Sequence, residues 1–173
     1  NHIDLRFPVD ELPDLTRVES VLKENPDIRL VYTTHNETGT GICNPIREIG
    51  ALAHRYGATF VVDTTSTLAM RPIDVARDNI DFCMASAQKG IMAMTGLSFV
   101  IGRTDLIVAS KDYPKRSYYC NLYLQYEYFE KTGQMHFTPP VQTVYAAVQG
   151  LKEYFAEGEI AKWERHKRVF EAI

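Results

Sequence analysis

Apolar runs separated by polar segments mark the strands that this sequence predicts. Four such runs lie at residues 28–32, 58–63, 80–85 and 97–102. Within the second and third runs, residues 60–62 and 82–85 are apolar without alternation, a pattern typical of strands that are buried on both faces. A further run, residues 2–12, alternates apolar with polar positions and also predicts a strand.

The segments between these runs carry the signals of helices. Residues 16–19 have the form of a capping box, and the apolar residues around them recur at helical spacing up to Asn25. Pro45 is suited to the first position of a second helix, which Gly57 would end. Further helices are predicted in residues 72–78, 104–110, 122 to near 133, 141–155, and from 158 onward.

The alternation of strands and helices predicts an α/β fold. We expect a mostly parallel sheet with flanking helices, joined by right-handed crossovers. The chain has 173 residues with 45% hydrophobic content, enough for one core of ordinary size.

Charge and cysteine content argue against several classes of protein. Basic residues number 19 and acidic residues 22, and the net charge of −3 favours neither nucleic acid nor an anionic membrane surface. Cys43, Cys83 and Cys120 are irregularly spaced, which argues against a disulfide framework or a zinc site. The sequence shows neither an apolar run of membrane-spanning length nor a signal-peptide pattern. We therefore expect a cytoplasmic protein.

Two chemically active side chains follow the second and third predicted strands. Asp63 ends one strand and Lys89 lies shortly after the other. Ligands of an open α/β sheet sit outside the carboxyl ends of its strands, so both side chains should project into one crevice. An acid and a lysine placed in this way suit pyridoxal phosphate, whose partners are a Schiff-base lysine and an acidic group for the pyridinium. On these two residues alone, a buried Asp–Lys ion pair is an equally good interpretation.

The polar turn 35–41 should open into the same crevice. It follows the first of these strands and is rich in hydroxyl, amide and glycine residues, which allow close backbone approach to a ligand. The alternative is an ordinary loop in which Thr38 and Thr40 bond the backbone.

Three motifs occur in the same order along the chain: His-x-Glu-Thr-x-Thr-Gly from His35, Val-Asp-Thr-x-Ser from Val62, and Ser-Ala-Gln-Lys from Ser86. Together they resemble the class V, fold type I aminotransferases, which depend on pyridoxal 5'-phosphate. The resemblance runs through nearly the whole chain. It implies that the sheet is part of the large domain of such a transferase.

Segments after Lys89 are similar to those of 2-aminoethylphosphonate–pyruvate aminotransferases. They are residues 118–123, 129–131 and 137–140. This resemblance implies transfer of the amino group of 2-aminoethylphosphonate to pyruvate, or the reverse. Three alternatives remain: an alanine– or serine–glyoxylate aminotransferase, a cysteine desulfurase-like lyase, and a non-catalytic fragment. Gln88, directly before Lys89, is more like the residue found in the alanine–glyoxylate branch.

The resemblance implies a role for each residue that contacts the cofactor ring. Lys89 would bind the cofactor covalently and then shuttle a proton, which suits an amine whose pKa falls readily. Asp63 would keep the pyridinium protonated. Thr38 would bond the phenolic oxygen or the substrate, and Thr65 would lie against the ring.

The resemblance also implies a phosphate site and a shared assembly. Ser86 and Gln88 would donate hydrogen bonds to the cofactor phosphate, and Thr138 would reach the phosphate of the neighbouring subunit's cofactor. A homodimer with shared sites follows. Residues 1–157 would be part of the large domain, without its N-terminal portion, and residues 158–173 would lead toward a small C-terminal domain outside this chain.

The remaining features favour structural roles. His2, His54, His136 and His166 lack metal-ligand spacing, whereas His35 could either lie over the ring or brace its loop. The basic run 162–168 has the pattern of a solvated helix face. The tyrosines of residues 118–128 are expected in the core or in a dimer interface.

Overall fold

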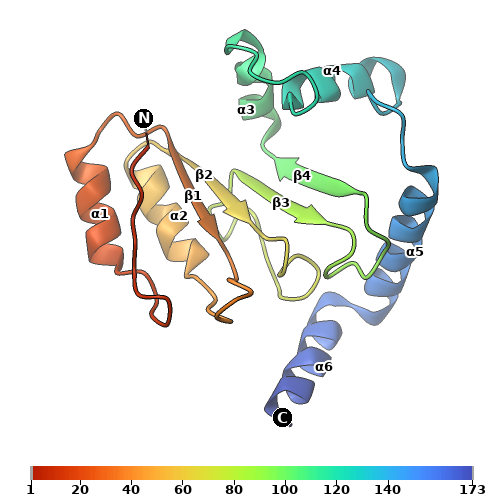
Figure 1. Cartoon of the computed structure of the whole chain (residues 1–173), viewed down its shortest axis with the longest axis horizontal. Coiled ribbons are helices and arrows are strands. Elements are labelled where there is room, and N and C mark those ends of the chain that lie inside the picture. The colour runs from red at the N-terminus through yellow and green to blue at the C-terminus, as the bar shows by residue number, and fades with distance from the viewer. Residues whose placement is uncertain (1, 173) are drawn as a thin grey trace.

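The computed structural model describes residues 2–172 and contains one four-stranded sheet (Figure 1). The strand order is β1-β2-β3-β4, with β1 Leu30–Thr34, β2 Thr59–Asp63, β3 Phe82–Ser86 and β4 Ser98–Gly102. The first three strands are parallel and β4 is antiparallel to β3. The predicted α/β fold with a mostly parallel sheet and flanking helices is confirmed.

Six α-helices and a short 3₁₀-helix are found in the described part of the chain. They are α1 Leu15–Glu24, α2 Ile46–Arg55, α3 Thr104–Ala109, η1 Ser110–Asp112, α4 Leu122–Thr132, α5 Val141–Glu157 and α6 Glu159–Glu171. Within residues 2–172, no helix combines the length and apolarity that crossing a membrane requires.

One face of the sheet packs against α2. The fully buried side chains of Phe60, Val62 and Cys83 point to this face and meet the apolar side of the helix. Gly50 allows the close approach, because a Cβ at this position would lie 2.8 Å from the Phe60 ring. This contact forms the main core and fixes the position of β2.

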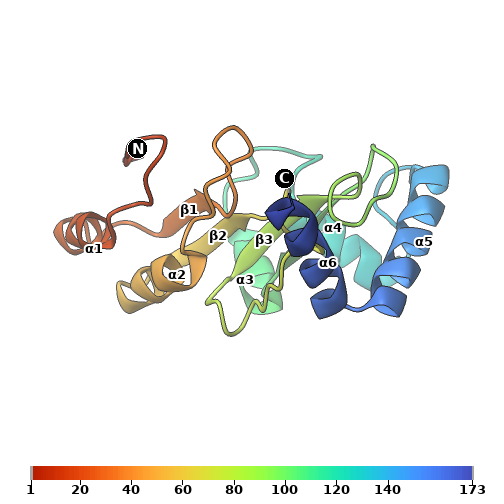
Figure 2. The same cartoon turned by 90° about the horizontal axis from the view of Figure 1, so that it is seen from below.

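The opposite face carries the polar ends of the strands. Successive side chains alternate between faces, so Asp63 points away from the face of Val62. Met84 is aligned with Asp63 in the strand register, and Ser86 is two residues further on, so all three share one face. In Figure 2, α2 and α3 lie below the sheet and the loop after β1 rises above it. The candidate site residues therefore point away from the main core.

The N-terminal segment 2–12 is not a strand, contrary to the prediction. It has no pairing partner within residues 2–172, and its apolar positions pack instead on α1, where Leu5 and Phe7 contact a cluster containing Val18 and Leu22. Alternation alone could not show this, because a strand needs a neighbour to complete its hydrogen bonds.

The cap of α1 is Asp14 and not the predicted box. Its carboxylate accepts hydrogen bonds from the N–H groups of Thr16 at 2.8 Å and Arg17 at 3.3 Å. Glu19 does not turn back to the helix start and binds Arg55 Nη1 at 2.7 Å. A tertiary contact thus replaces the second half of the capping box.

Two other predictions differ from the structure. β1 begins two residues later than expected, and residues 72–78 form turns in which Asp74 Oδ1 accepts the N–H groups of Ala76 and Arg77. The same kind of bond caps α1 at Asp14, but here the chain leaves the helical conformation at Asn79, whose φ is +58°, so only a single turn forms. β4 runs antiparallel because the connection 87–97 is short and non-helical, whereas parallel crossovers need more chain.

Asp81 fastens the amino end of β3 to three other elements. Its carboxylate accepts the N–H of Phe60 at 2.8 Å and lies 2.8 Å from His54 Nε2 and 3.0 Å from Arg103 Nη1. Burial raises the pKa of Asp81, but these three partners together hold it below its ordinary value. This buried carboxylate lies at the opposite edge from Asp63 and is structural.

Candidate active site

The carboxyl ends of β1, β2 and β3 bring the predicted site residues to one edge of the sheet. Asp63 is the last residue of β2, Ser86 is the last residue of β3, and Thr34 at the end of β1 lies beside Asp63 in the register. The loop 35–41 and the turn 87–90 leave the sheet at this same edge. It is the edge at which parallel α/β sheets bind ligands.

Asp63 and Lys89 form no ion pair with each other in the described chain. Oδ1 of the half-buried Asp63 accepts the N–H of Thr65 at 2.8 Å. Lys89 is exposed, and within residues 2–172 its side chain has no ion-pair partner. The Asp–Lys ion pair that the sequence allowed is therefore absent from the described chain. Both groups are available to a ligand.

Ser86 has a buried hydroxyl without a partner. Its Oγ is one of three buried side-chain polar atoms in residues 2–172 that make no hydrogen bond. Leaving such a group unsatisfied costs about 1–3 kcal/mol. The hydroxyl is suited to donate to an oxygen-rich ligand, and Gln88 stands exposed two residues away. The pair fits a phosphate group.

The two threonines of the loop after β1 differ in their hydrogen bonds. Thr40 Oγ1 accepts the N–H of Ile42 at 3.3 Å, and Glu37 Oε1 accepts that of Gly39 at 3.1 Å. Thr38 is exposed, and no hydrogen bond of its side chain is found in the described chain. The ordinary-loop interpretation holds for Thr40 and leaves Thr38 free for a ligand.

His35 braces this loop against the segment after β2. The backbone N–H of His35 donates to the carbonyl of Asp63 at 2.8 Å, and the ring Nδ1 lies 2.9 Å from Thr67 Oγ1. Burial, with help from the positive charge of Arg71, lowers the pKa of His35 to about 4, so the ring is neutral at pH 7. Of the two roles that the sequence left open, these contacts support bracing.

The two remaining predicted residues are placed differently. Thr65 is half-buried directly beside Asp63. Thr138 is exposed in the connection between α4 and α5, and no hydrogen bond of its side chain is found in residues 2–172. The connection between α4 and α5 lies on the far side of β4 from β2 (Figure 1).

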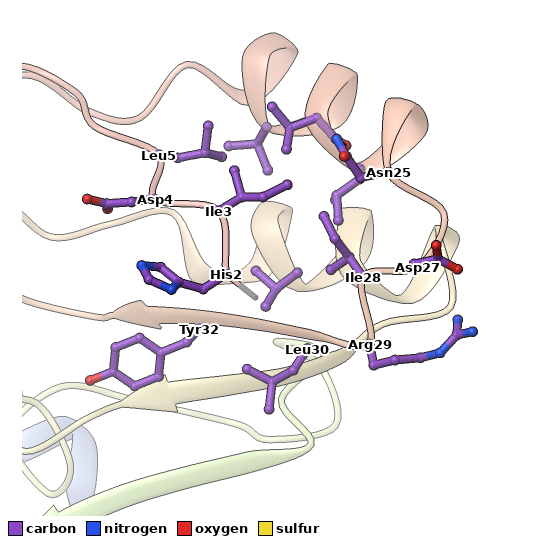
Figure 3. Close-up of a pocket in the computed structure, with 14 residues that line it drawn as sticks. His2, Ile3, Asp4, Leu5, Asn25, Asp27, Ile28, Arg29, Leu30 and Tyr32 are labelled. Carbon is purple, nitrogen blue, oxygen red and sulfur yellow. The ribbon is translucent and has the colours of Figure 1, made fainter.

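One cavity of the structure lies away from this edge of the sheet. It has a volume of about 960 Å³ and lies beside β1, between the N-terminal segment and the end of α1 (Figure 3). Leu30 and Tyr32 of β1 line it, but none of the predicted site residues does. This cavity is thus separate from the predicted site residues at the sheet edge.

Lys162 lies near the site, although its sequence pattern did not indicate this. Lys162 was assigned to a solvated helix face, and this is wrong, because only 3% of it is exposed. Its Nζ donates to the carbonyl of Gly90, directly after Lys89. Charge patterning cannot reveal this contact, which depends on how α6 packs.

The chain is similar in sequence to known aminotransferases. The family model described as Aminotransferase class-V matches residues 4–172. A protein of Salmonella typhimurium (strain LT2), named 2-aminoethylphosphonate–pyruvate transaminase, is 41% identical over 157 residues, which cover 90% of this chain. The chain spans only 42% of that relative's length.

Solved structures show the same likeness. The pyridoxamine–pyruvate aminotransferase of Mesorhizobium loti matches with a TM-score of 0.85 and 27% identity, over 94% of this chain and 42% of that one. The alanine–glyoxylate aminotransferase of Nostoc sp. matches with a TM-score of 0.86 and 24% identity, over 94% and 44%. The second match shows the fold alone.

Proposed function

Because this chain belongs to the aminotransferase class-V family, we propose that the protein acts as an aminotransferase that depends on pyridoxal 5'-phosphate. The observation that carries the proposal is the shared sheet edge, where an unpaired carboxylate, a free amine and an unsatisfied hydroxyl come together. They belong to Asp63, Lys89 and Ser86. The cofactor, when bound, supplies an electron-accepting ring.

The residues of this edge fit the two ends of such a cofactor. At the ring end, Asp63 would accept a hydrogen bond from the ring nitrogen through the oxygen that Thr65 leaves free. Lys89 would hold the cofactor covalently and would serve as the group that accepts and returns a proton.

At the phosphate end, Ser86 and Gln88 would donate hydrogen bonds to the phosphate oxygens. Thr38, in the loop after β1, would bond the phenolic oxygen or the substrate. Thr65 would lie against the ring beside Asp63.

The proposed substrates are 2-aminoethylphosphonate and pyruvate. They are supported by the similarity to curated relatives named 2-aminoethylphosphonate–pyruvate transaminase. An alanine– or serine–glyoxylate reaction is the second candidate, because Gln88 is similar to the residue that the alanine–glyoxylate branch has at this position.

A panel of amino donors distinguishes these reactions in the full-length protein. With pyruvate as acceptor, we expect 2-aminoethylphosphonate to react at least about tenfold faster than serine, since one specific contact of about 1.4 kcal/mol gives that factor. Alanine formation is measured by coupled assay. Faster reaction of serine or alanine with glyoxylate would move the protein to the second candidate. Sulfur release from cysteine would indicate a lyase, and an absence of turnover with every donor would indicate a non-catalytic chain.

We also propose a cytoplasmic homodimer with shared active sites. Tyr118, Tyr119 and Phe129 are all more than half exposed, so the aromatic segment is not core in this chain. Tyr118 and Tyr119 pack on Phe137, next to Thr138, and form an apolar surface of the kind found in interfaces.

The proposed domain organisation assigns residues 1–157 to part of the large domain, and residues 158–173 to a segment that leads toward a small domain.

Thr138→Ala tests the shared site. The exposed side chain has no partner in its own described chain, so we expect a folded protein that retains the cofactor about 10–100-fold more weakly, as for loss of a bond to a charged group. Thr104→Ala, at an exposed threonine, is the matched control.

Mixed dimers of Thr138→Ala and Lys89→Ala subunits decide between the two arrangements. If sites are shared, both lesions fall on one site and the other regains normal cofactor affinity. Weak binding at both sites would show that Thr138 acts within its own subunit.

A further inference from the structure

We propose that Lys162 is a positioning residue, which fixes the turn 87–93 and thereby sets the direction of the Lys89 side chain. The role of Lys89 in this inference rests on the proposed function. The contact between Lys162 and the turn stands on the structure alone. It joins α6 to the residue that directly follows Lys89.

Lys162 is buried in an unusual way for a lysine. It is 3% exposed, whereas lysines are almost never fully buried unless they are paired. Within residues 2–172 it takes part in no ion pair. Its Nζ donates instead to the carbonyl of Gly90 at 2.5 Å, and the ring of Tyr154 lies 5.4 Å from the same atom. The buried ammonium group is therefore directed at the turn.

Close backbone approach holds the turn on two further sides. A Cβ at Gly90 would lie 1.9 Å from the carbonyl oxygen of Leu68, and a Cβ at Gly150 would lie 2.5 Å from that of Ile91. The loop after β2 and helix α5 thus press on neighbouring residues of the turn. Lys162 supplies the third contact, which is the only polar side-chain contact to the Gly90 carbonyl in the described chain.

The turn needs such support because its own conformation is strained. Met92 has a φ of +61°, in the left-handed region that non-glycine residues rarely adopt. Strained residues persist only where the surrounding structure determines them. Two internal hydrogen bonds close the turn, from the N–H of Met92 to the carbonyl of Lys89 and from the N–H of Ala93 to that of Ala87, each at 2.9 Å.

Helix α6 also contacts the segment that follows Asp63. The guanidinium of Arg71 lies 4.8 Å from the centre of the Trp163 ring, next to Lys162 in the chain. Two adjacent residues of α6 therefore connect the loop after β2 with the turn after β3. This arrangement holds the supports of Asp63 and Lys89 in one relative position.

Stability and the mobility of the turn should respond differently to the loss of Lys162 if it is a positioning residue. Burial lowers the pKa of Lys162 and opposes its charged form. Lys162→Met removes this desolvation penalty but leaves the buried carbonyl of Gly90 without its hydrogen bond, and the two effects on stability oppose each other. We therefore expect Lys162→Met to remain folded with only a small change in melting temperature, while the turn loosens.

Hydrogen exchange of the full-length protein without cofactor tests the contact directly. In Lys162→Met we expect the amides of Met92 and Ala93 to exchange about tenfold faster, the factor given by loss of one hydrogen bond to a charged group. Lys167→Met, at an exposed lysine of the same helix, should leave both rates unchanged. Lys162→Gln, whose shorter amide does not extend as far toward Gly90, should act like Lys162→Met and replaces it if that variant does not fold.

Two outcomes would overturn the inference. Unchanged exchange at Met92 and Ala93 would show that the turn does not need Lys162. Equally faster exchange throughout α6 would show that Lys162 only docks the helix.

The cofactor-loaded protein gives a second measurement. The visible circular dichroism of the bound cofactor depends on the orientation of its lysine link, and we expect it to lose amplitude in Lys162→Met but not in Lys167→Met. An unchanged signal would reject the effect on Lys89 direction even if exchange is faster. If no cofactor binds to the parent protein, the proposed function fails, and the exchange experiment still decides the role of Lys162 in the turn.

Discussion

Lys89→Ala is expected to abolish turnover in the full-length protein while leaving its fold intact. The side chain is exposed in a turn and makes no ion pair within residues 2–172, so its removal should change the free energy of unfolding by no more than about 0.5 kcal/mol. Loss of proton transfer alone lowers a rate by about 10²–10⁴-fold. Loss of the covalent attachment adds to this, because the cofactor is then no longer held by the amine.

Borohydride reduction followed by peptide mapping identifies the attached lysine. We expect the pyridoxyl label on Lys89 in the parent protein and no label at that position in the variant. Lys152→Ala, at an exposed lysine of α5, is the matched control and should keep both label and turnover. A label on another lysine of the parent protein would overturn the assignment of Lys89.

Asp63→Asn is expected to lower the rate strongly without unfolding the protein. The amide oxygen of asparagine can still accept the N–H of Thr65, which now bonds Asp63 Oδ1 at 2.8 Å. The second carboxylate oxygen becomes an amide NH₂ group, which is a donor and can no longer accept a hydrogen bond from the ring nitrogen. A hydrogen bond to a charged group contributes about 1.5–3 kcal/mol, so kcat should fall by at least about 10–100-fold.

Steady-state kinetics with saturating cofactor measure this effect, and thermal unfolding checks the fold. Asp10→Asn removes an exposed carboxylate of the N-terminal segment and serves as the control for lost charge. Near-normal kcat in Asp63→Asn would identify Asp63 as a structural carboxylate.

Local sequence signals determined most helices and strands, and they determined the sheet edge at which the site residues lie. The continuous apolar run before Asp63 predicted β2, and the run before Ser86 predicted most of β3. Gly57 and Gly133 ended helices as expected, because both adopt the positive φ that glycine tolerates. Since parallel strands end at one edge, strand assignment was enough to place Asp63 near the Lys89 turn.

Contacts between distant residues decided what the sequence could not. Residues 2–12 lost their predicted strand because no described neighbour pairs with them, and the second half of the predicted α1 capping box was displaced because Glu19 binds Arg55. His35 has the same local pattern whether it faces a ligand or Thr67. Lys162 follows the charge pattern of an exposed face, yet the packing of α6 directs it to Gly90. Periodicity reports which face of an element is apolar, whereas burial of a single polar side chain depends on the element packed against it.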